Sequence, residues 1–424
     1  MSVGPCPKRR REMLKAAFPV VAGAMATIIL CHSAVASERD CVDAACPVIT
    51  IEGDAPSRLP DGRPSPFRGF ADPSIRRDPV SETLWMAYSW PNVGGGGSGS
   101  GRQGMSPRVD VHLARSLDKG RTWRFVKTLW SPAPMVGPNG DPGHLSFEVA
   151  SLLPVRRADG VTTWYGARLS YFIPENGGFR RRPTDSFHIL VSAASSAEEL
   201  AQAPSDRLGG AATGAAWQAR INLAGLSAET RHCSIWNEPA LYHDGQELFL
   251  ALSCMAFNGK TPDLPRSDLV LFATRAEGLP NQWAWRHAGK LAGHEEARDL
   301  GGLRLTQVEF AKARDGALLA LVTPDTWNEE AQDFVHQGCR AVETERLPSG
   351  GFRLARRAAG GLKVRASVMA SDAGPAGTAA CSYDPASETG IVMGKRVKNG
   401  SGFNAARHGG AELSVTLHAT GVHP

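Results

Sequence analysis

A β-hairpin signal near the middle of the chain is the feature that most constrains the fold. The segment Trp236–Leu252 places Asp244-Gly245 between two runs of strand-forming residues, and this dipeptide favours the tight turn of an antiparallel hairpin. An isolated hairpin cannot bury its apolar face in water. The segment therefore predicts further strands packed against it.

Four other segments repeat the shape of this hairpin at intervals of roughly 70 to 85 residues. Further strand-like runs lie between the hairpins, and each hairpin with its following strands predicts a four-stranded sheet. Sheets that repeat in this way share a core when they are arranged around one axis. We therefore predict an all-β fold, a five-bladed β-propeller. The other hairpins begin at Ala71, Phe147, Gln307 and Ala380, and the intervening runs are Val109–Arg115, Phe187–Ser192, Asp268–Thr274, Cys339–Thr344 and Leu413–His418.

Alignment of the hairpins on their turns brings acidic residues to one position. Asp72, Glu238 and Glu309 each lie six residues before the aspartate of the turn. Glu148 fits if its hairpin is longer, and the fifth copy has Thr378 there. The first strand of each blade lines the channel of a propeller, so we expect four carboxylates to face one pocket.

The first 36 residues have the pattern of an export signal. Basic residues 8–11 are followed by an apolar run to Leu30 and by the small residues Ala34-Val35-Ala36, as at a signal-peptide cleavage site. Residues 10–15 resemble a twin-arginine signal, with Arg9 where Ser or Thr is usual. We expect residues 1–36 to be removed and the protein to be periplasmic or secreted; an uncleaved membrane anchor is the alternative.

The domain division follows from this signal. Residues 37–66 form an N-terminal segment in which Val48–Glu52 is expected to close the ring against Leu413–His418, and residues 67–424 form the propeller domain. The net charge of +5 comes mostly from residues 1–36, and the rest is nearly neutral. This balance excludes a nucleic-acid partner, and we expect a monomer without stable membrane insertion after cleavage.

Six of the eight cysteines lie beyond residue 36. An even number in an exported chain predicts disulfides, and the turn register places Cys233 opposite Cys254. No Cys-x-x-Cys or His-rich spacing is present, so neither a metal nor another cofactor is expected. The other expected pairs are Cys41–Cys46 and Cys339–Cys381.

The run Ser116–Trp123 matches the Asp-box, Ser-x-Asp-x-Gly-x-Thr-Trp. Here Asp118 can accept backbone N–H bonds, Gly120 permits a positive φ, and Trp123 can plug the edge of a blade. The chain thus resembles the sialidase-like (Asp-box) β-propeller superfamily, in which the motif lies on turns remote from the pocket. This resemblance gives a six-bladed sialidase-type propeller as the alternative fold.

The carboxylate pattern also resembles the five-bladed glycosidases of the arabinanase, xylosidase and invertase type, from Phe70 to about Gly390. The resemblance implies that Asp72 is the base or nucleophile and Glu238 the general acid, because glycoside hydrolysis uses such a pair. Glu148 stands where that group uses an aspartate to tune the pKa of the acid. The predicted catalytic residues are therefore Asp72, Glu238 and Glu148.

Side chains near these acids are candidates for substrate binding. Trp236 is a sugar-stacking type, and Asn237 and Glu309 can bind hydroxyls. Arg168 can bind a carboxylate, as can Arg68, Arg304 and Arg340. Tyr383 is the tyrosine that a sialidase reaction would need, and His144 could contact a ligand. Three of these residues also have a structural interpretation. Trp236 could pack in the hydrophobic core, Arg168 could form a structural ion pair, and His144 could be exposed to solvent.

The predicted function is an exported glycoside hydrolase that cleaves a glycosidic bond of a carbohydrate substrate with a carboxylate pair. Two alternatives are a non-catalytic carbohydrate-binding propeller and a true exo-sialidase. The Arg-Ile-Pro opening of sialidases is absent, and Ala71–Ile75 stands in its place.

Overall fold

Antiparallel strands make up most of the computed structural model, which describes residues 36–95, 105–174, 186–259, 261–329, 333–399 and 412–424. The predicted export segment, apart from Ala36, lies outside these residues. Ala36–Pro424 forms one compact unit. Its described part contains one short α-helix, α1 (His294–Asp299), beside short 3₁₀ turns. The predicted all-β class is confirmed. Within the described residues, no helix combines the length and the apolar character that a membrane span requires.

The first three repeats each form an antiparallel sheet whose strands pair in chain order, with one added edge strand in two of them. Their bounds are β4 (Ala71–Arg77), β5 (Leu84–Gly95), β6 (Met105–Ser116) and β7 (Trp123–Trp130), with β2 (Ile51–Glu52) beside β7; β9 (Pro142–Arg156), β10 (Thr162–Pro174), β11 (His188–Ala194) and β12 (Ser205–Leu208), with β8 (Ala133–Val136) beside β9; and β13 (Ile235–His243), β14 (Leu248–Asn258), β15 (Thr261–Thr274) and β16 (Arg286–Ala292).

The last two repeats are joined into one larger sheet by β19 (Asp333–Gln337), which pairs with a strand of each. The fourth repeat also carries β1 (Ser37–Asp40) in parallel on its outer edge. The bounds are β17 (Arg304–Lys312), β18 (Leu318–Asn328), β20 (Cys339–Arg346) and β24 (Val364–Met369); then β25 (Gly377–Ser382), β26 (Val392–Asn399), β27 (Glu412–Ala419) and β3 (Phe67–Gly69); smaller strands are β21 (Phe352–Leu354), β22 (Arg356–Arg357) and β23 (Gly360–Leu362).

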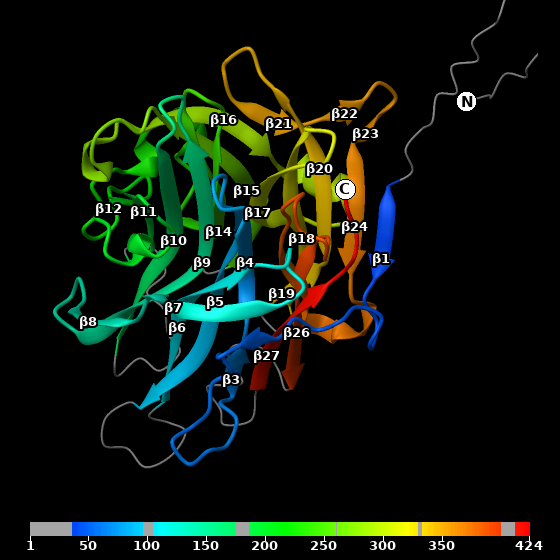
Figure 1. Ribbon diagram of the computed structural model, residues 1–424. Helices are drawn as coiled ribbons and strands as arrows, with labels where there is room; N and C mark the ends of the chain where they lie inside the picture. Colours follow the sequence, from blue (N-terminus) through cyan, green and yellow to red (C-terminus); the bar gives the residue numbers. More distant parts are fainter. Residues whose placement is uncertain (1–35, 96–104, 175–185, 260, 330–332, 400–411) are drawn as a thin grey trace, which may run out of the picture. The chain divides into compact units, whose positions relative to one another are not determined.

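The first strands of the repeats contact one another in a closed cycle. β4 contacts β9, β9 contacts β13, β13 contacts β17, β17 contacts β25, and β25 returns to β4. In Figure 1 the sheets are arranged around these strands. A cycle of sheets with their first strands innermost is the arrangement of a β-propeller. The pairings fit the predicted five repeats, and the blade number itself stays a prediction.

The hydrophobic core lies between neighbouring sheets. Leu169 of β10 packs in one cluster with Trp236 and Leu250 of the third repeat, and Phe249 packs with Phe310 of the fourth. These strands alternate inward and outward side chains, so both faces of each sheet become buried when the sheets stack. The stacking fixes the inner strands and thereby positions the channel.

The ring closes through a different strand from the one predicted. Val48 does bridge His418, and the Ile49 N–H donates to the Leu417 carbonyl at 2.8 Å. Ile51–Glu52, however, turns away and pairs with β7 of the first repeat. The fourth strand beside β27 is β3, which runs parallel to it. The prediction for Val48–Glu52 is therefore only partly correct, because this short segment spans two sheets.

The three predicted disulfides are confirmed: Cys41–Cys46, Cys233–Cys254 and Cys339–Cys381. Cys254 lies opposite Trp236 in the third repeat, close to the predicted register. Cys339–Cys381 joins β20 to β25 and so ties the fourth repeat to the fifth. These disulfides reduce the conformational entropy of the unfolded chain and should therefore stabilise the folded ring.

The Asp-box forms the turn between β6 and β7. Asp118 accepts a hydrogen bond from the Thr122 N–H at 2.9 Å, Gly120 has a φ of 87°, and Trp123 is 2% exposed. The motif lies on no wall of the central cavity described below. Its geometry fits a structural turn, and membership of the sialidase-like superfamily remains a prediction.

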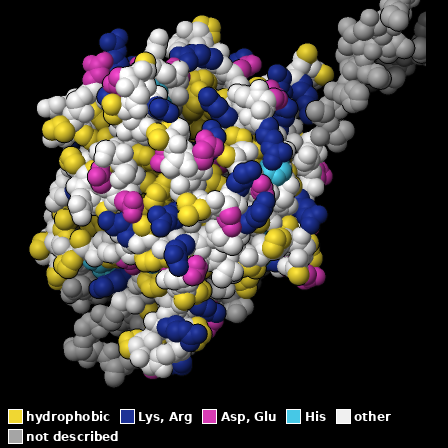
Figure 2. Space-filling model, viewed as in Figure 1, with side chains coloured by type: hydrophobic (Ala, Val, Ile, Leu, Met, Phe, Trp, Pro, Cys, Tyr) yellow, Lys and Arg dark blue, Asp and Glu magenta, His cyan; other side chains and the backbone are white. Residues whose placement is uncertain are grey.

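Basic and acidic side chains are interspersed on the face shown in Figure 2, with hydrophobic side chains between them. This pattern agrees with the nearly balanced charge of the chain beyond residue 36. That face therefore has no extended electrostatic potential of one sign, which binding of a polyanion would require.

Candidate functional site

A left-handed residue interrupts every first strand at a bulge in the strand pairing. Such backbone conformations cost energy in residues other than glycine and often mark functional sites. The residues and their φ angles are Asp72 (49°), Val149 (52°), Glu238 (54°), Gln307 (28°) and Ala380 (58°), and the pairing with the next strand shifts at each of them.

The residue at the bulge is the structurally equivalent position in each repeat. Asp72 and Glu238 match, as the turn alignment predicted, but Glu309 and Thr378 do not lie at this position. The fourth hairpin is two residues longer between bulge and turn, and the fifth is two shorter. Strands alternate faces with a period of two, so such changes preserve which side chains face inward while shifting the register.

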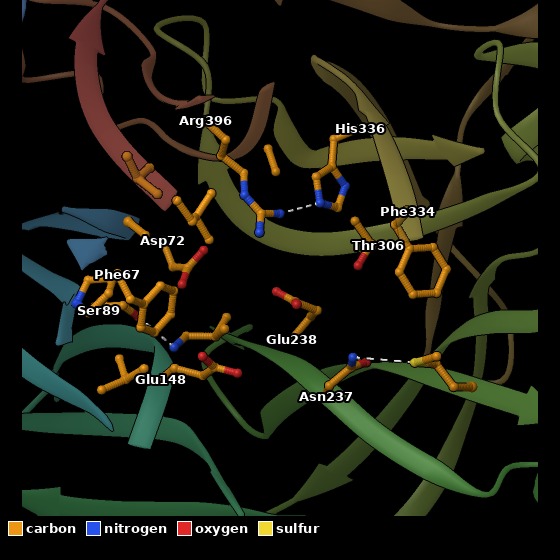
Figure 3. Close-up of a pocket in the computed structure, with 18 of the residues that line it drawn as sticks. Phe67, Asp72, Ser89, Glu148, Asn237, Glu238, Thr306, Phe334, His336 and Arg396 are labelled. Atoms are coloured by element: carbon orange, nitrogen blue, oxygen red, sulfur yellow. Dashed lines mark hydrogen bonds between the residues drawn. The ribbon is translucent and has the colours of Figure 1, made fainter. Parts of the chain in front are cut away.

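A cavity of about 310 Å³ lies beside the bulges. Asp72 of β4, Glu148 of β9 and Glu238 of β13 line it, and their carboxylates point toward the same space (Figure 3). Glu148 directly precedes the bulge residue Val149, so its side chain reaches the cavity from one residue earlier than the other two. The further lining includes Phe67, Ser89, Phe187, Asn237, Met255, Arg304, Thr306, Phe334, His336 and Arg396.

The proximity of the acids changes their proton affinities. Burial, then repulsion from Glu148, raises the pKa of Asp72 to about 6, against a hydrogen bond from Ser89 and the charge of Arg396. Burial, then repulsion from Asp72 and Glu148, raises the pKa of Glu238 well above its ordinary value. At neutral pH, Asp72 is therefore mostly ionised, while burial and repulsion favour the protonated form of Glu238. Two acids held in opposite states are the requirement for acid–base chemistry.

The opposite wall is basic and comes from the fourth and fifth repeats. Asp325 is fully buried and accepts hydrogen bonds from Arg304 Nη2 at 2.9 Å and from His336 Nδ1 at 2.5 Å. The guanidinium of Arg396 donates to the other ring nitrogen of His336. Burial lowers the pKa of His336, so the ring is neutral and serves as an acceptor for Arg396.

Apolar and amide groups complete the walls. Phe334 stacks on the Arg304 guanidinium, whose central carbon lies 4.0 Å from the ring centroid. Asn237 directs Nδ2 to the sulfur of Met255 at 3.6 Å, while its Oδ1 is buried without a hydrogen-bond partner among the described residues. Aromatic faces and a spare amide acceptor are suitable for the C–H face and the hydroxyls of a sugar.

Below the cavity, a polar belt connects the first strands. The Ser74 hydroxyl accepts from the Leu152 N–H at 2.9 Å, and Ser151 accepts from the Leu241 N–H at 3.1 Å. Each serine lies two residues after its bulge and thereby links adjacent repeats. The hydroxyl of Ser74 in turn donates to Glu309 at 3.0 Å.

Glu309 belongs to this belt and does not line the cavity. It is 2% exposed and forms an ion pair with Arg76 at 2.6 Å. The predicted contact with substrate hydroxyls is therefore replaced by a structural contact, because the bulge in β17 lies at Gln307. Burial raises the pKa of Glu309, although Arg76 opposes this change.

Four other predicted binding residues also lie away from the cavity lining. Trp236 is 1% exposed in the core, where its indole N–H donates to the Gly210 carbonyl at 2.7 Å. Arg168 is buried under Trp130 and donates to Ser192 at 3.2 Å. His144 contacts the Pro107 carbonyl at 3.2 Å, and Tyr383 is 1% exposed beside His423. Of the predicted binding residues, Asn237 alone lines the cavity.

The sequence alone did not single out the group formed by Asp325, His336 and Arg396. Arg304 stood out only as one of several arginines that could bind a carboxylate. These four residues come from β17, β18, β19 and β26, and none belongs to a local motif. The only signal would have been an acid opposite a histidine on neighbouring strands. Recognising it requires the strand register that places Asp325 opposite His336.

One described cluster combines metal-binding residue types, namely His232, Cys233 and Cys254. Both cysteines are consumed in a disulfide, so no thiolate remains to bind an ion. The cluster gives no reason to revise the expectation that the protein lacks a metal centre.

The fold and site together define an all-β, propeller-type protein with a carboxylate-lined cavity. No protein-family model and no curated protein matches the sequence. Among solved structures, the chain is similar to a xylan beta-1,4-xylosidase from Bacillus Halodurans C-125, with a TM-score of 0.39 and 11% identity, covering 74% of this chain and 46% of that one. The chain thus spans less than half of the length of that xylosidase.

Two further similar structures are arabinanases. An exo-1,5-alpha-L-arabinanase from a bovine ruminal metagenomic library has a TM-score of 0.39 and 11% identity over 83% of this chain and 94% of that one. The Penicillium chrysogenum alpha-L-arabinanase has a TM-score of 0.39 and 12% identity, with coverage of 84% and 94%. Similarity at this level leaves the activity to be inferred from the site itself.

Proposed function

We propose that this protein is a glycoside hydrolase that acts in its central cavity, with Glu238 as the general acid and Asp72 as its partner. The observation that carries the proposal is the convergence of Asp72, Glu148 and Glu238 on one cavity, with the pKa of Glu238 raised by burial and by the other two acids. Glycoside hydrolysis needs one carboxyl group that is protonated and one that is ionised.

The roles follow from the proton affinities. Glu238 protonates the oxygen of the leaving group, and ionised Asp72 either activates water or attacks the anomeric carbon. Glu148 keeps the proton on Glu238 by repulsion, which is the tuning role expected from the resemblance to five-bladed glycosidases. The left-handed backbone at Asp72 and Glu238 holds both side chains on the cavity wall.

The substrate is a carbohydrate of a size that the cavity can hold. Asn237 supplies amide hydrogen bonds, and Phe67, Phe187 and Phe334 supply apolar surface for one face of a sugar ring. A sialidase reaction is disfavoured, because Tyr383 lies in the core and the cavity lining in the described residues offers no tyrosine in its place.

The export of the protein, its monomeric state and its five blades complete the proposal. Three disulfides support an oxidising compartment. The chain from residue 37 should be found outside the cytoplasm when expressed with residues 1–36, and inside when Arg10 and Arg11 are replaced by lysine.

The activity is tested with the chain from residue 37 on a panel of nitrophenyl glycosides of pentoses, hexoses and uronates, and on a sialoside. We expect release of nitrophenol from at least one non-sialic glycoside and its loss in Asp72→Asn. The control is Glu247→Gln, because Glu247 is a partly buried carboxylate of the turn between β13 and β14 that pairs with Arg286 outside the cavity lining. Binding of sugars without any turnover across the panel would contradict the proposal and identify a carbohydrate-binding propeller.

A further inference from the structure

The cavity has a polarity that glycoside hydrolysis alone does not require. Its acidic wall comes from β4, β9 and β13, and its basic wall comes from β17, β19 and β26. The acidic wall has the two groups that the reaction uses. The basic wall needs a separate explanation, because two guanidinium groups are costly to hold in a partly desolvated cavity.

The charge of Arg304 is balanced, but its hydrogen bonding is incomplete. Arg304 is 2% exposed and forms an ion pair with Asp325 through Nε and Nη2. Its Nη1 is buried without a hydrogen-bond partner among the described residues. A buried donor of a charged group that lacks a partner costs stability, and a donor on the wall of a cavity can recover that cost from a ligand.

Arg396 forms no ion pair with a carboxylate of its own wall among the described residues. Its hydrogen bond goes to His336, which is neutral because it accepts from Arg396 while donating to Asp325. The carboxylate that interacts with Arg396 through its charge is Asp72 on the facing wall, whose pKa Arg396 lowers. The carboxylate of Asp325 must therefore serve two cations, and one positive charge on this wall is left over.

We infer that the saccharide bound in this cavity carries a carboxylate group, as in a hexuronate, and that this group is bound by Arg396 and by Nη1 of Arg304. The inference rests on the proposed function, because it assigns the same cavity to the sugar. A planar guanidinium matches the geometry of a carboxylate and can bind it with two parallel hydrogen bonds.

The position of the two walls agrees with the geometry of a uronate. In a hexuronate in its pyranose form, the anomeric carbon and the ring carbon that bears the carboxylate lie on either side of the ring oxygen. With the carboxylate against Arg396, the anomeric carbon faces Asp72 and Glu238 on the other wall. A singly charged group also fits better than a doubly charged phosphate, because Asp72 and Glu148 line the same cavity and would repel the larger charge.

The experiment measures binding, so that it does not depend on turnover. D-Galacturonate and D-glucuronate are titrated into the wild-type protein by calorimetry, each beside its methyl ester and its neutral hexose. Free monosaccharides have no glycosidic bond to cleave. We expect at least one uronate to bind about 10- to 100-fold more tightly than its methyl ester, the usual worth of a charge-assisted hydrogen bond, and we expect the preference to shrink with added salt.

Two variants locate the effect. Arg396→Gln should abolish the preference for the acid over the ester, while Arg396→Lys should keep part of it. Arg340→Gln is the matched control, because Arg340 is similarly half-buried but lies on β20 outside the cavity lining and donates to the Cys339 carbonyl. Circular dichroism melting verifies that each variant is folded, and the salt dependence of the wild type decides the question if Arg396→Gln does not fold.

The outcomes separate this inference from the proposed function. Equal binding of acid and ester, or no binding of any uronate, would overturn the inference, whereas hydrolysis of neutral glycosides would still support the proposed function. Uronate binding that depends on Arg396 without hydrolysis of any glycoside would support the inference and contradict the proposed catalysis.

Discussion

Asp72 and Glu238 occupy the same position of two different repeats, each as the left-handed residue of a β-bulge in a first strand. Their φ angles are 49° and 54°, and the pairing with the next strand shifts at both residues. The shared backbone geometry explains why both carboxylates reach one cavity although the residues are far apart in sequence. It also makes the division of labour between them testable.

The clearest test of the general acid is Glu238→Gln, which keeps the shape of the side chain and removes its proton. Turnover of glycosides with poor leaving groups should fall by roughly 10²- to 10⁴-fold, the usual contribution of general acid catalysis. Activated nitrophenyl glycosides should be affected less because their leaving groups need little protonation. Steady-state kinetics on matched alkyl and nitrophenyl glycosides measure the difference.

Asp72→Asn provides the contrast for that experiment. Attack on the sugar is needed for either leaving group, so both substrate classes should be impaired in Asp72→Asn. Unchanged activity of Glu238→Gln on both classes would show that Glu238 only lines the cavity.

The pH dependence of activity should follow the two raised pKa values. Asp72 must be ionised, and its pKa is about 6, so kcat/KM should fall as the pH drops through about 6. Glu238 must be protonated, so activity should fall again on the alkaline side. Removal of the Glu148 charge relieves repulsion on both acids. Glu148→Gln should therefore lower both pKa values and move the whole pH profile to lower pH.

The control for this shift is Glu229→Gln, because the Glu229 side chain is 74% exposed and lies near His287 outside the cavity. Its profile should coincide with that of the wild type. A Glu148→Gln profile with both limbs in their original positions would show that Glu148 does not tune the pair.

The buried ion pair of Arg76 and Glu309 should be a stability determinant of the ring. Their side chains are 9% and 3% exposed, so Arg76→Met leaves a carboxylate without its counter-charge in the interior. We expect a loss of roughly 3–5 kcal/mol in the free energy of unfolding at neutral pH. The loss should diminish as the pH falls, because protonation of Glu309 removes the uncompensated charge.

Urea unfolding of Arg76→Met, Glu309→Gln and the double variant measures this coupling. The double variant should be more stable than Arg76→Met, because the amide introduced by Glu309→Gln is neutral and can still accept hydrogen bonds from Ser74 and Ser151. Additive losses in the double variant would show that the pair is not coupled.

Ring closure should depend on Gly69 of β3. This residue has a φ of 112°, and a Cβ atom built on it would lie 2.0 Å from the Val415 carbonyl oxygen of β27. Gly69→Ala should therefore separate β3 from β27 and destabilise the ring by more than the cost of the backbone conformation alone, which is roughly 1–3 kcal/mol. Activity should fall too, because Phe67 of the same strand lines the cavity.

Gly245→Ala is a matched control, since Gly245 has a similar φ of 103° but open space around the added methyl group. Thermal melting and amide hydrogen exchange of the two variants separate the steric effect from the conformational one. Equal losses of stability in both variants would mean that β3 does not hold the ring closed.

The sequence by itself determined the repeat, the all-β class, the Cys233–Cys254 disulfide and the equivalence of Asp72 with Glu238. These properties depend on local signals: turn dipeptides such as Asp244-Gly245, alternation along single strands, and the distance of a residue from its own turn. The same local reasoning failed for Glu309. The fourth hairpin is two residues longer between its bulge and its turn, and this change shifts the register while the same side chains still face inward, so the alternation pattern does not reveal it.

The tertiary structure alone decided which side chains share the cavity. Asp325, His336 and Arg396 lie on three strands. Only the pairing of those strands brings His336 and Arg396 together on the cavity wall, with Asp325 as the buried partner of His336. The burial of Trp236 and Tyr383 was likewise set by the stacking of neighbouring sheets. The physical reason is that proton affinity and ligand contact depend on distances through space, and the closure of the ring sets these distances.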